Sequence, residues 1–202
     1  MKKIVGLLSG VLLASSLNAY DGKIKSLVGV EAGYGQFEYN AANEDNINQG
    51  RNSSSEDFGT LGLKIGAQTK EFRIFLGAEY YVVDGAFDYA NSFGGSFQYL
   101  IYVNNNFNFF FGINGGLMNL KVVDNGIHKS FEYSDPYFGG DVGINYDFND
   151  NLGLEVGFRY ININADNTQY YTDEHGDQQT RTYTIDTMMH LYTSLIFKFN
   201  MD

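Results

Sequence analysis

Residues 152–160 read Leu-Gly-Leu-Glu-Val-Gly-Phe-Arg-Tyr, so every second position is apolar. Successive side chains of a β-strand point to opposite faces, and this stretch therefore predicts a strand with one apolar and one polar face. The apolar face carries no charge, whereas the other face sets Glu155 and Arg159 among Gly153 and Gly157. Such a strand separates an apolar environment from a polar one.

The same alternation recurs along the chain, and helical periodicity is hard to find beyond residue 20. Eight strands are predicted, over residues 25–39, 58–68, 72–83, 96–103, 107–122, 135–148, 152–163 and 184–199. Three connections are three-residue turns, whereas the other four, 40–57, 84–95, 123–134 and 164–183, take 18, 12, 12 and 20 residues. Short turns at one end and long acidic loops at the other predict an antiparallel up-and-down meander.

Alternation alone fits a soluble barrel with an apolar interior, such as a secreted lipocalin-like carrier, and a membrane barrel with a polar lumen. The apolar face has no charge in any of the eight runs, and a Lys or Arg there would cost about 2–4 kcal/mol at mid-depth in lipid. Glycines gather on the polar face, where the lumen of an eight-stranded barrel is only just wide enough for side chains. Both observations favour the membrane barrel.

Aromatic residues on the apolar face gather toward its two ends, as two girdles at the bilayer interfaces would require. We expect Tyr34, Tyr80, Phe97, Phe138 and Tyr160 near the long loops, and Phe72, Phe107, Tyr146, Phe148, Phe197 and Phe199 near the short turns. An open sheet edge in lipid would leave backbone groups unsatisfied, so the first and last strands must pair. The predicted fold is an all-β, eight-stranded, antiparallel up-and-down transmembrane β-barrel.

Composition narrows the class further. The 202 residues include no Cys, and their net charge of -11 comes without a basic cluster, which argues against disulfide scaffolds, zinc-thiolate sites and nucleic-acid binding. Residues 1–19 have the parts of a secretory signal, namely Lys2 and Lys3, an apolar stretch and a small residue, Ala19, before the expected cut. Residues 20–202 are then one barrel domain in the cell outer membrane of a Gram-negative bacterium.

The chain resembles the small eight-stranded outer-membrane barrels, namely the membrane domain of outer membrane protein A, its smaller relatives and the opacity-type, porin-family surface proteins. Local patterns such as Gly-Val-Glu-Ala-Gly-Tyr-Gly at 29–35 carry the resemblance. The families end in an aromatic strand read by the barrel-assembly machinery, and Leu191, Thr193, Leu195, Phe197 and Phe199 match it, although three residues follow here. The resemblance implies a monomer in outer-membrane lipid, and attachment to the cell wall is not implied, because no peptidoglycan-binding domain is expected after the eighth predicted strand.

Six charged residues of the polar face are expected near mid-barrel, and charges enclosed there must be paired or hydrogen-bonded. They are Glu31, Lys64, Glu79, Asp141, Glu155 and Arg159. A salt-bridged plug of the lumen is the main interpretation. The alternative is a narrow gated porin or cation-preferring channel, because four carboxylates face two bases.

Other candidates carry weaker signals. His190 and Ser194 are similar to the His and Ser pairs of outer-membrane lipid-modifying enzymes, but both are predicted to face the lumen rather than lipid. Asp173, Glu174, His175 and Asp177 are interpreted as solvated charge rather than a cation site. Neither an enzyme activity, a cofactor nor a metal is expected. We expect a structural or adhesion-type role through the long acidic extracellular loops, with Tyr170 and Tyr171 as contacts for an extracellular ligand or host surface.

Overall fold

The strands close into one barrel. The computed structural model describes residues 24–43, 52–83, 87–124, 129–172 and 178–200, and the expected signal segment 1–19 lies outside them. The strands are β1 (Lys25–Asn43), β2 (Asn52–Gln68), β3 (Phe72–Val83), β4 (Phe87–Tyr102), β5 (Phe107–Asp124), β6 (Lys129–Asn149), β7 (Leu152–Thr172) and β8 (Gln178–Asn200). No helix among the described residues is long and apolar enough to cross a bilayer.

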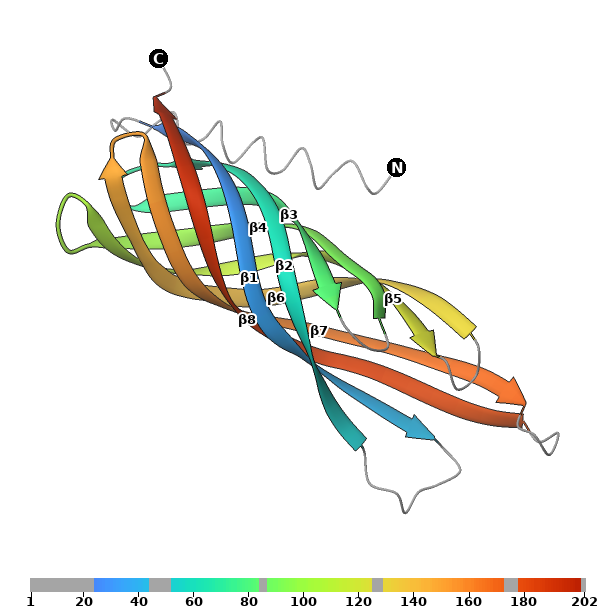
Figure 1. The fold of residues 1–202 in the computed structure, drawn as a ribbon. Helices are drawn as coiled ribbons and strands as arrows, with labels where there is room; N and C mark the ends of the chain where they lie inside the picture. Colours follow the sequence, from blue (N-terminus) through green and yellow to red (C-terminus); the bar gives the residue numbers. More distant parts are fainter. Residues whose placement is uncertain (1–23, 44–51, 84–86, 125–128, 173–177, 201–202) are drawn as a thin grey trace.

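Each strand pairs antiparallel with its neighbour in sequence, and β1 also pairs with β8, so the predicted closed eight-stranded barrel is confirmed (Figure 1). The tight turns lie at one end of the barrel. In two of them an asparagine side-chain oxygen accepts hydrogen bonds from backbone N–H groups of the turn. The amide carbonyl oxygen of Asn104 accepts from the backbone N–H groups of Asn106 and Phe107 at 2.9 and 3.0 Å, and Asn149 accepts from Asn151 in the same way at 2.9 Å.

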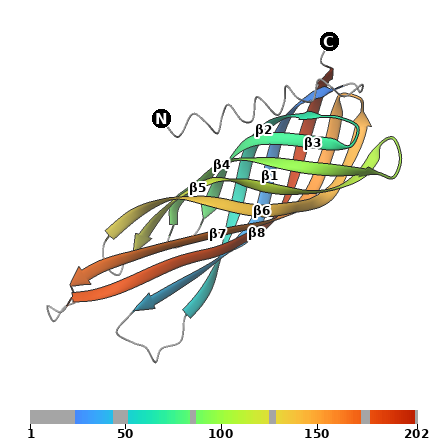
Figure 2. The same ribbon diagram turned by 180° about the vertical axis from the view of Figure 1, so that it is seen from behind.

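The prediction of four long loops was wrong. The strands continue far into them, and only residues 44–51, 84–86, 125–128 and 173–177 lie between strands at that end. The β1–β2 and β7–β8 pairs reach furthest from the barrel (Figure 2). These extensions pair through their backbones, and their sequences in β1, β2, β7 and β8 lack the regular apolar alternation of the eight predicted runs. Sequence periodicity therefore reports the membrane segment of each strand and misses the rest.

The apolar face of every strand points outward. Exposed apolar side chains run along each strand, for example Leu61, Leu63 and Ile65 at 63, 65 and 60 % exposure in β2. At the outer edge of this belt the Tyr34 hydroxyl donates to Asp57 at 2.7 Å and the Gln36 amide donates to it at 3.0 Å, which lowers the pKa of the Asp57 carboxyl. Asp57 thus marks where the apolar belt ends and the aqueous side begins.

The girdle near the short turns is a run of ring contacts, with Phe72 on Phe97 and Tyr99 at centroid distances of 5.4 and 5.2 Å. Phe97 was predicted at the opposite end, and that placement was wrong. Because β4 begins at Phe87 rather than residue 96, Phe97 pairs with Ile74 near the start of β3. Phe93, paired with Ala78, occupies the level expected for Phe97.

The lumen is layered. Along β1 the inward residues run from Leu27 through Glu31 to Phe37, and along β3 from Phe75 through Glu79 to Tyr81. The layer toward the long hairpins is an apolar cluster of Phe37, Phe58, Tyr81, Ala90, Met118, Leu120, Ile161, Ile163 and Met188, here called the outer apolar layer. Two smaller clusters, Leu27 with Phe75 and Ile196, and Leu100 with Phe110 and Tyr192, lie toward the short turns and form the inner apolar layer. Charged residues occupy the level between the two layers.

Glycines in the lumen make room for this packing, as the segregation of glycine by face predicts. At Gly157 an added Cβ would lie 2.5 Å from the Tyr192 ring, and at Gly143 it would lie 2.4 Å from the Val156 carbonyl oxygen. The outward-facing Gly59 has no atom within 4 Å of such a Cβ. A side chain at Gly143 would have to displace backbone, whereas one at Gly59 would project into open space.

Gly143→Ala should therefore destabilise the barrel by about 1–3 kcal/mol, the usual cost of overpacking. Gly59→Ala is the matched control and should be neutral or slightly stabilising, because alanine loses less backbone entropy in a strand. Urea unfolding in phospholipid vesicles, followed by far-UV circular dichroism because the chain has no Trp, measures both. Equal stability of the two variants would contradict this account of the lumen.

Candidate functional site

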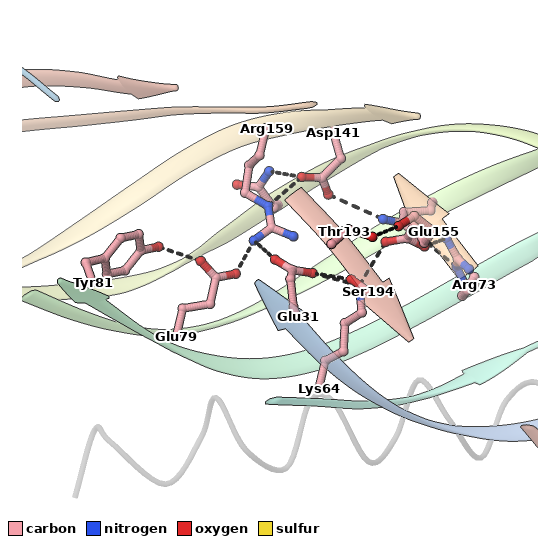
Figure 3. A network of polar contacts seen from close by, with 12 residues as sticks. Glu31, Lys64, Arg73, Glu79, Tyr81, Asp141, Glu155, Arg159, Thr193 and Ser194 are labelled. Carbon is pink, nitrogen blue, oxygen red and sulfur yellow. Dashed lines mark hydrogen bonds and ion pairs between the residues drawn. The ribbon is translucent and has the colours of Figure 1, made fainter. Parts of the chain in front are cut away.

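Lys64 lies at the centre of the charged level (Figure 3). Its ammonium donates to Glu31 Oε2 at 2.8 Å, to Glu155 Oε1 at 2.8 Å and to Ser194 Oγ at 2.9 Å, so all three N–H groups have partners from β1, β7 and β8. The Ser194 hydroxyl in turn donates to Glu31 Oε2 at 2.9 Å. One lysine on β2 thus links three other strands across the lumen.

Arg159 gathers the remaining predicted carboxylates. Its Nε donates to Asp141 Oδ1 at 2.8 Å, and its Nη1 donates to Glu31 Oε1 at 3.0 Å and also to Glu79. The guanidinium lies over the Tyr192 ring at 4.6 Å from its centroid, a favourable cation–π position. Because Glu31 contacts both Lys64 and Arg159, all six residues predicted for the lumen lie in one connected network.

Arg73 also belongs to this network, although it is not one of the six residues expected near mid-barrel. It is the second residue of β3, so its Cα lies near the short turns. Its side chain, 0 % exposed, extends to pair with Glu155, while its Nε donates to Gln98 at 2.8 Å. A prediction based on the position of Cα along the strand misses side chains as long as that of arginine. The sequence signal for Arg73 is its position on the polar face of β3 together with the length of its side chain.

Charge in the network is nearly balanced. Glu31, Glu79, Asp141 and Glu155 supply four carboxylates, and Lys64, Arg73 and Arg159 supply three bases, which leaves one negative charge. The sequence predicted only two of these bases, Lys64 and Arg159, near mid-barrel. Buried ions lose their hydration and are tolerated only with close partners, so each base here contacts at least one carboxylate.

Between its two apolar layers the network has little access to water. Tyr81, of the outer apolar layer, donates to Glu79 Oε2 at 2.6 Å, and Tyr192, of the inner apolar layer, lies under Arg159. An ion moving along the lumen would have to pass both the apolar residues and the paired charges. The ion pairs connect strands that are not neighbours in the sheet across the lumen.

His190 and Ser194 do not form a nucleophile–base pair. The hydroxyl of Ser194 donates to Glu31, and the ring nitrogens of His190 have no hydrogen-bond partner within the described part of the chain. Nucleophilic catalysis needs the base within hydrogen-bond reach of the hydroxyl. This pair therefore lacks the contact that an acyl-transfer site requires.

The candidates at the far end are only partly described. Tyr170 and Tyr171 lie in β7, not in a loop, and their backbones pair with Thr180 and Gln179 of β8. Their side chains, and all of Asp173, Glu174, His175 and Asp177, lie outside the described residues. The contact role expected of the two tyrosines stays a prediction.

Solved structures share this fold at low sequence identity. Neisserial surface protein A, from Neisseria, aligns with a TM-score of 0.61 at 16% identity over 86% of this chain and 97% of its own. Outer membrane protein OprG from Pseudomonas aeruginosa gives 0.60 at 14% identity over 89% and 97%, and outer membrane protein H (OprH) from P. aeruginosa gives 0.50 at 19% identity over 87% and 99%. No sequence relative was found among curated proteins.

The sequence itself matches the family described as outer membrane protein beta-barrel domain over residues 7–185, which is most of the chain. This match agrees with the closed eight-stranded barrel and its apolar exterior. The protein is a member of the outer membrane protein β-barrel domain family and resides in the cell outer membrane.

Proposed function

We propose that this protein is a closed, non-enzymatic barrel that acts as a structural and surface-interaction protein through its extracellular hairpins. The observation that carries the proposal is the filled lumen, in which apolar layers enclose an ion-paired network while strand pairs extend well beyond the membrane. A rigid scaffold that presents exposed segments is a common arrangement for binding. The protein would act as a monomer, inserted into outer-membrane lipid by the barrel-assembly machinery.

Charge at the outer end supports a contact role. The four segments 40–57, 84–95, 123–134 and 164–183 contain twelve acidic and three basic residues, most of the net charge of the chain. A surface of one sign attracts oppositely charged partners and raises their association rate. We therefore expect basic extracellular ligands or host surfaces as partners, with Tyr170 and Tyr171 as apolar anchors.

Binding should move with the hairpins. Residues 40–57 and 164–183, transplanted onto an inert eight-stranded barrel, should transfer adhesion of bacteria to cultured cells or to immobilised matrix proteins. Replacing Asp166, Asp173, Glu174 and Asp177 by their amides should weaken the adhesion, and added salt should do the same. Tyr170→Ser with Tyr171→Ser tests the anchors separately. A transplant without gain in adhesion would count against the surface role.

Conductance was the alternative function, and the apolar layers oppose it. Planar-bilayer recordings of the purified protein should show no discrete current steps, because Phe37, Phe58 and Tyr81 are 0–1 % exposed and fill the outer lumen. Steps that change in Lys64→Ala or Arg159→Ala would instead establish the lumen as an ion pathway.

The network should matter for stability more than surface ion pairs do. Arg159→Met leaves Glu31, Glu79 and Asp141 without their shared base, and removing one partner of a buried pair costs about 3–5 kcal/mol. Lys25→Met is the control, since Lys25 Nζ lies 4.0 Å from the fully exposed Asp150 carboxylate and donates to the Asp150 backbone carbonyl at 3.0 Å on the exposed surface. That change should cost less than about 1 kcal/mol. Urea unfolding in vesicles compares the two, and similar losses would refute the stabilising role of the network.

A further inference from the structure

His190 is a buried polar side chain that the network leaves unused. Its imidazole is 1 % exposed, and neither Nδ1 nor Nε2 has a hydrogen-bond partner among the described residues. Aromatic rings surround it, with those of Phe58, Tyr192 and Tyr81 at centroid distances of 5.8, 6.0 and 6.4 Å. A buried polar group without a partner is costly, and a bound water or ion is one way to satisfy it.

Two carboxylates lie next to this imidazole. One ligand atom from each of Glu31, Glu79 and His190 lies within 4.8 Å of the other two, a spacing that a single ion bridges after small side-chain shifts. Arg159 contacts both carboxylates, but each carboxylate has about four lone-pair positions. Glu31 uses the rest of its contacts on Lys64 and Ser194, and Glu79 on Tyr81, so both keep acceptor capacity.

The surroundings suit a hydrated cation. A cavity of about 40 Å³ is lined by Glu31 and Glu79, together with Lys64, Arg159 and Ser92, and it lies beside His190 without including it in its lining. That volume has room for about three water-sized molecules, which would complete a coordination shell begun by three side chains.

We propose that Glu31, Glu79 and His190 bind one divalent transition-metal ion inside the barrel. One imidazole with two carboxylates is a borderline-hard ligand set that suits Zn²⁺, Mn²⁺ or Fe²⁺ rather than Ca²⁺ or Cu⁺. The three residues come from β1, β3 and β8, so the ion would link β3 to the directly paired strands β1 and β8 across the intervening β2. This site is distinct from the acidic loop segment and independent of the surface role.

The apolar layers determine how the ion enters. Because His190 adjoins Phe58 and Tyr81 of the outer apolar layer, an ion at this site would be shielded from bulk water. Metal should therefore be acquired as the barrel closes, and afterwards it should resist removal by a chelator. Carboxylates on the surface would release their ions at once under the same treatment.

The experiment refolds the full chain from urea into phospholipid vesicles with Zn²⁺, removes loose metal with excess chelator, and counts retained zinc per folded barrel by mass spectrometry. Folded protein is quantified by its mobility on unboiled gels. We expect about one zinc per barrel for the natural sequence, and an unfolding temperature higher by on the order of 5 °C than for protein refolded without metal.

Two variants and a control complete the test. His190→Asn and the near-isosteric Glu79→Gln should retain no zinc, and Glu79→Gln keeps the comparison valid if the histidine variant folds poorly. Asp150→Asn removes a fully exposed carboxylate at the short-turn end and should retain zinc like the natural sequence. Natural protein that retains no zinc, or equal retention in all four proteins, would overturn the proposal. A cobalt-loaded sample should show visible absorption bands that are lost in His190→Asn.

Discussion

A bilayer offers no hydrogen-bond partners to the backbone, and this constraint determines the rest of the molecule. An eight-stranded sheet has two edges, and only the pairing of β1 with β8 removes them. Closure then fixes the two environments of every strand. Outward side chains contact lipid and must be apolar, whereas inward side chains share a lumen so narrow that glycine must alternate with larger residues.

The interior has to be filled once the wall is closed. Here it is packed much like a soluble protein, with Phe37, Phe58 and Tyr81 in one layer and Leu100, Phe110 and Tyr192 in another. The largest group of charged residues occupies the level between them, and a second ion pair, Lys198 with Asp147, lies toward the short turns. Apolar packing and ion pairing therefore perform different tasks: the first excludes water from the lumen, and the second links strands that are not neighbours in the sheet.

The sequence predicted what lipid contact imposes. Alternation predicted all eight strands, the apolar exterior and barrel closure, because a shift of one residue within a membrane segment would place a charge in lipid. The prediction failed at the outer ends of the strands, toward the long hairpins. The extension of β1 past Asn40 pairs through its backbone but shows no regular alternation in its sequence. In β4 the alternation continues through Ser92 and Phe93 but is followed by Gly94 and Gly95, so the strand was predicted to start too late and Phe97 was misplaced.

The sequence also predicted most of the charged residues that lie between the two apolar layers. The alternation of faces and the position along each strand predicted that Glu31, Lys64 and Arg159 lie together. They contact one another directly or through shared partners. The prediction missed Arg73, whose Cα lies near the turn while its guanidinium reaches Glu155. Nor did the sequence reveal that His190 lacks a hydrogen-bond partner, since that depends on which side chains the neighbouring strands place beside it.

The distribution of the network over the strands has a consequence for assembly. Glu31 lies on β1, Lys64 on β2, Asp141 on β6, Arg159 on β7 and Ser194 on β8, so the ion pairs Lys64–Glu155 and Arg159–Glu31 span the seam between the first and last strands. A partly assembled sheet would expose these charges without partners to lipid, at a cost of several kcal/mol for each ion. Intermediates are thereby penalised and the finished barrel is favoured, so insertion and closure become a single cooperative event.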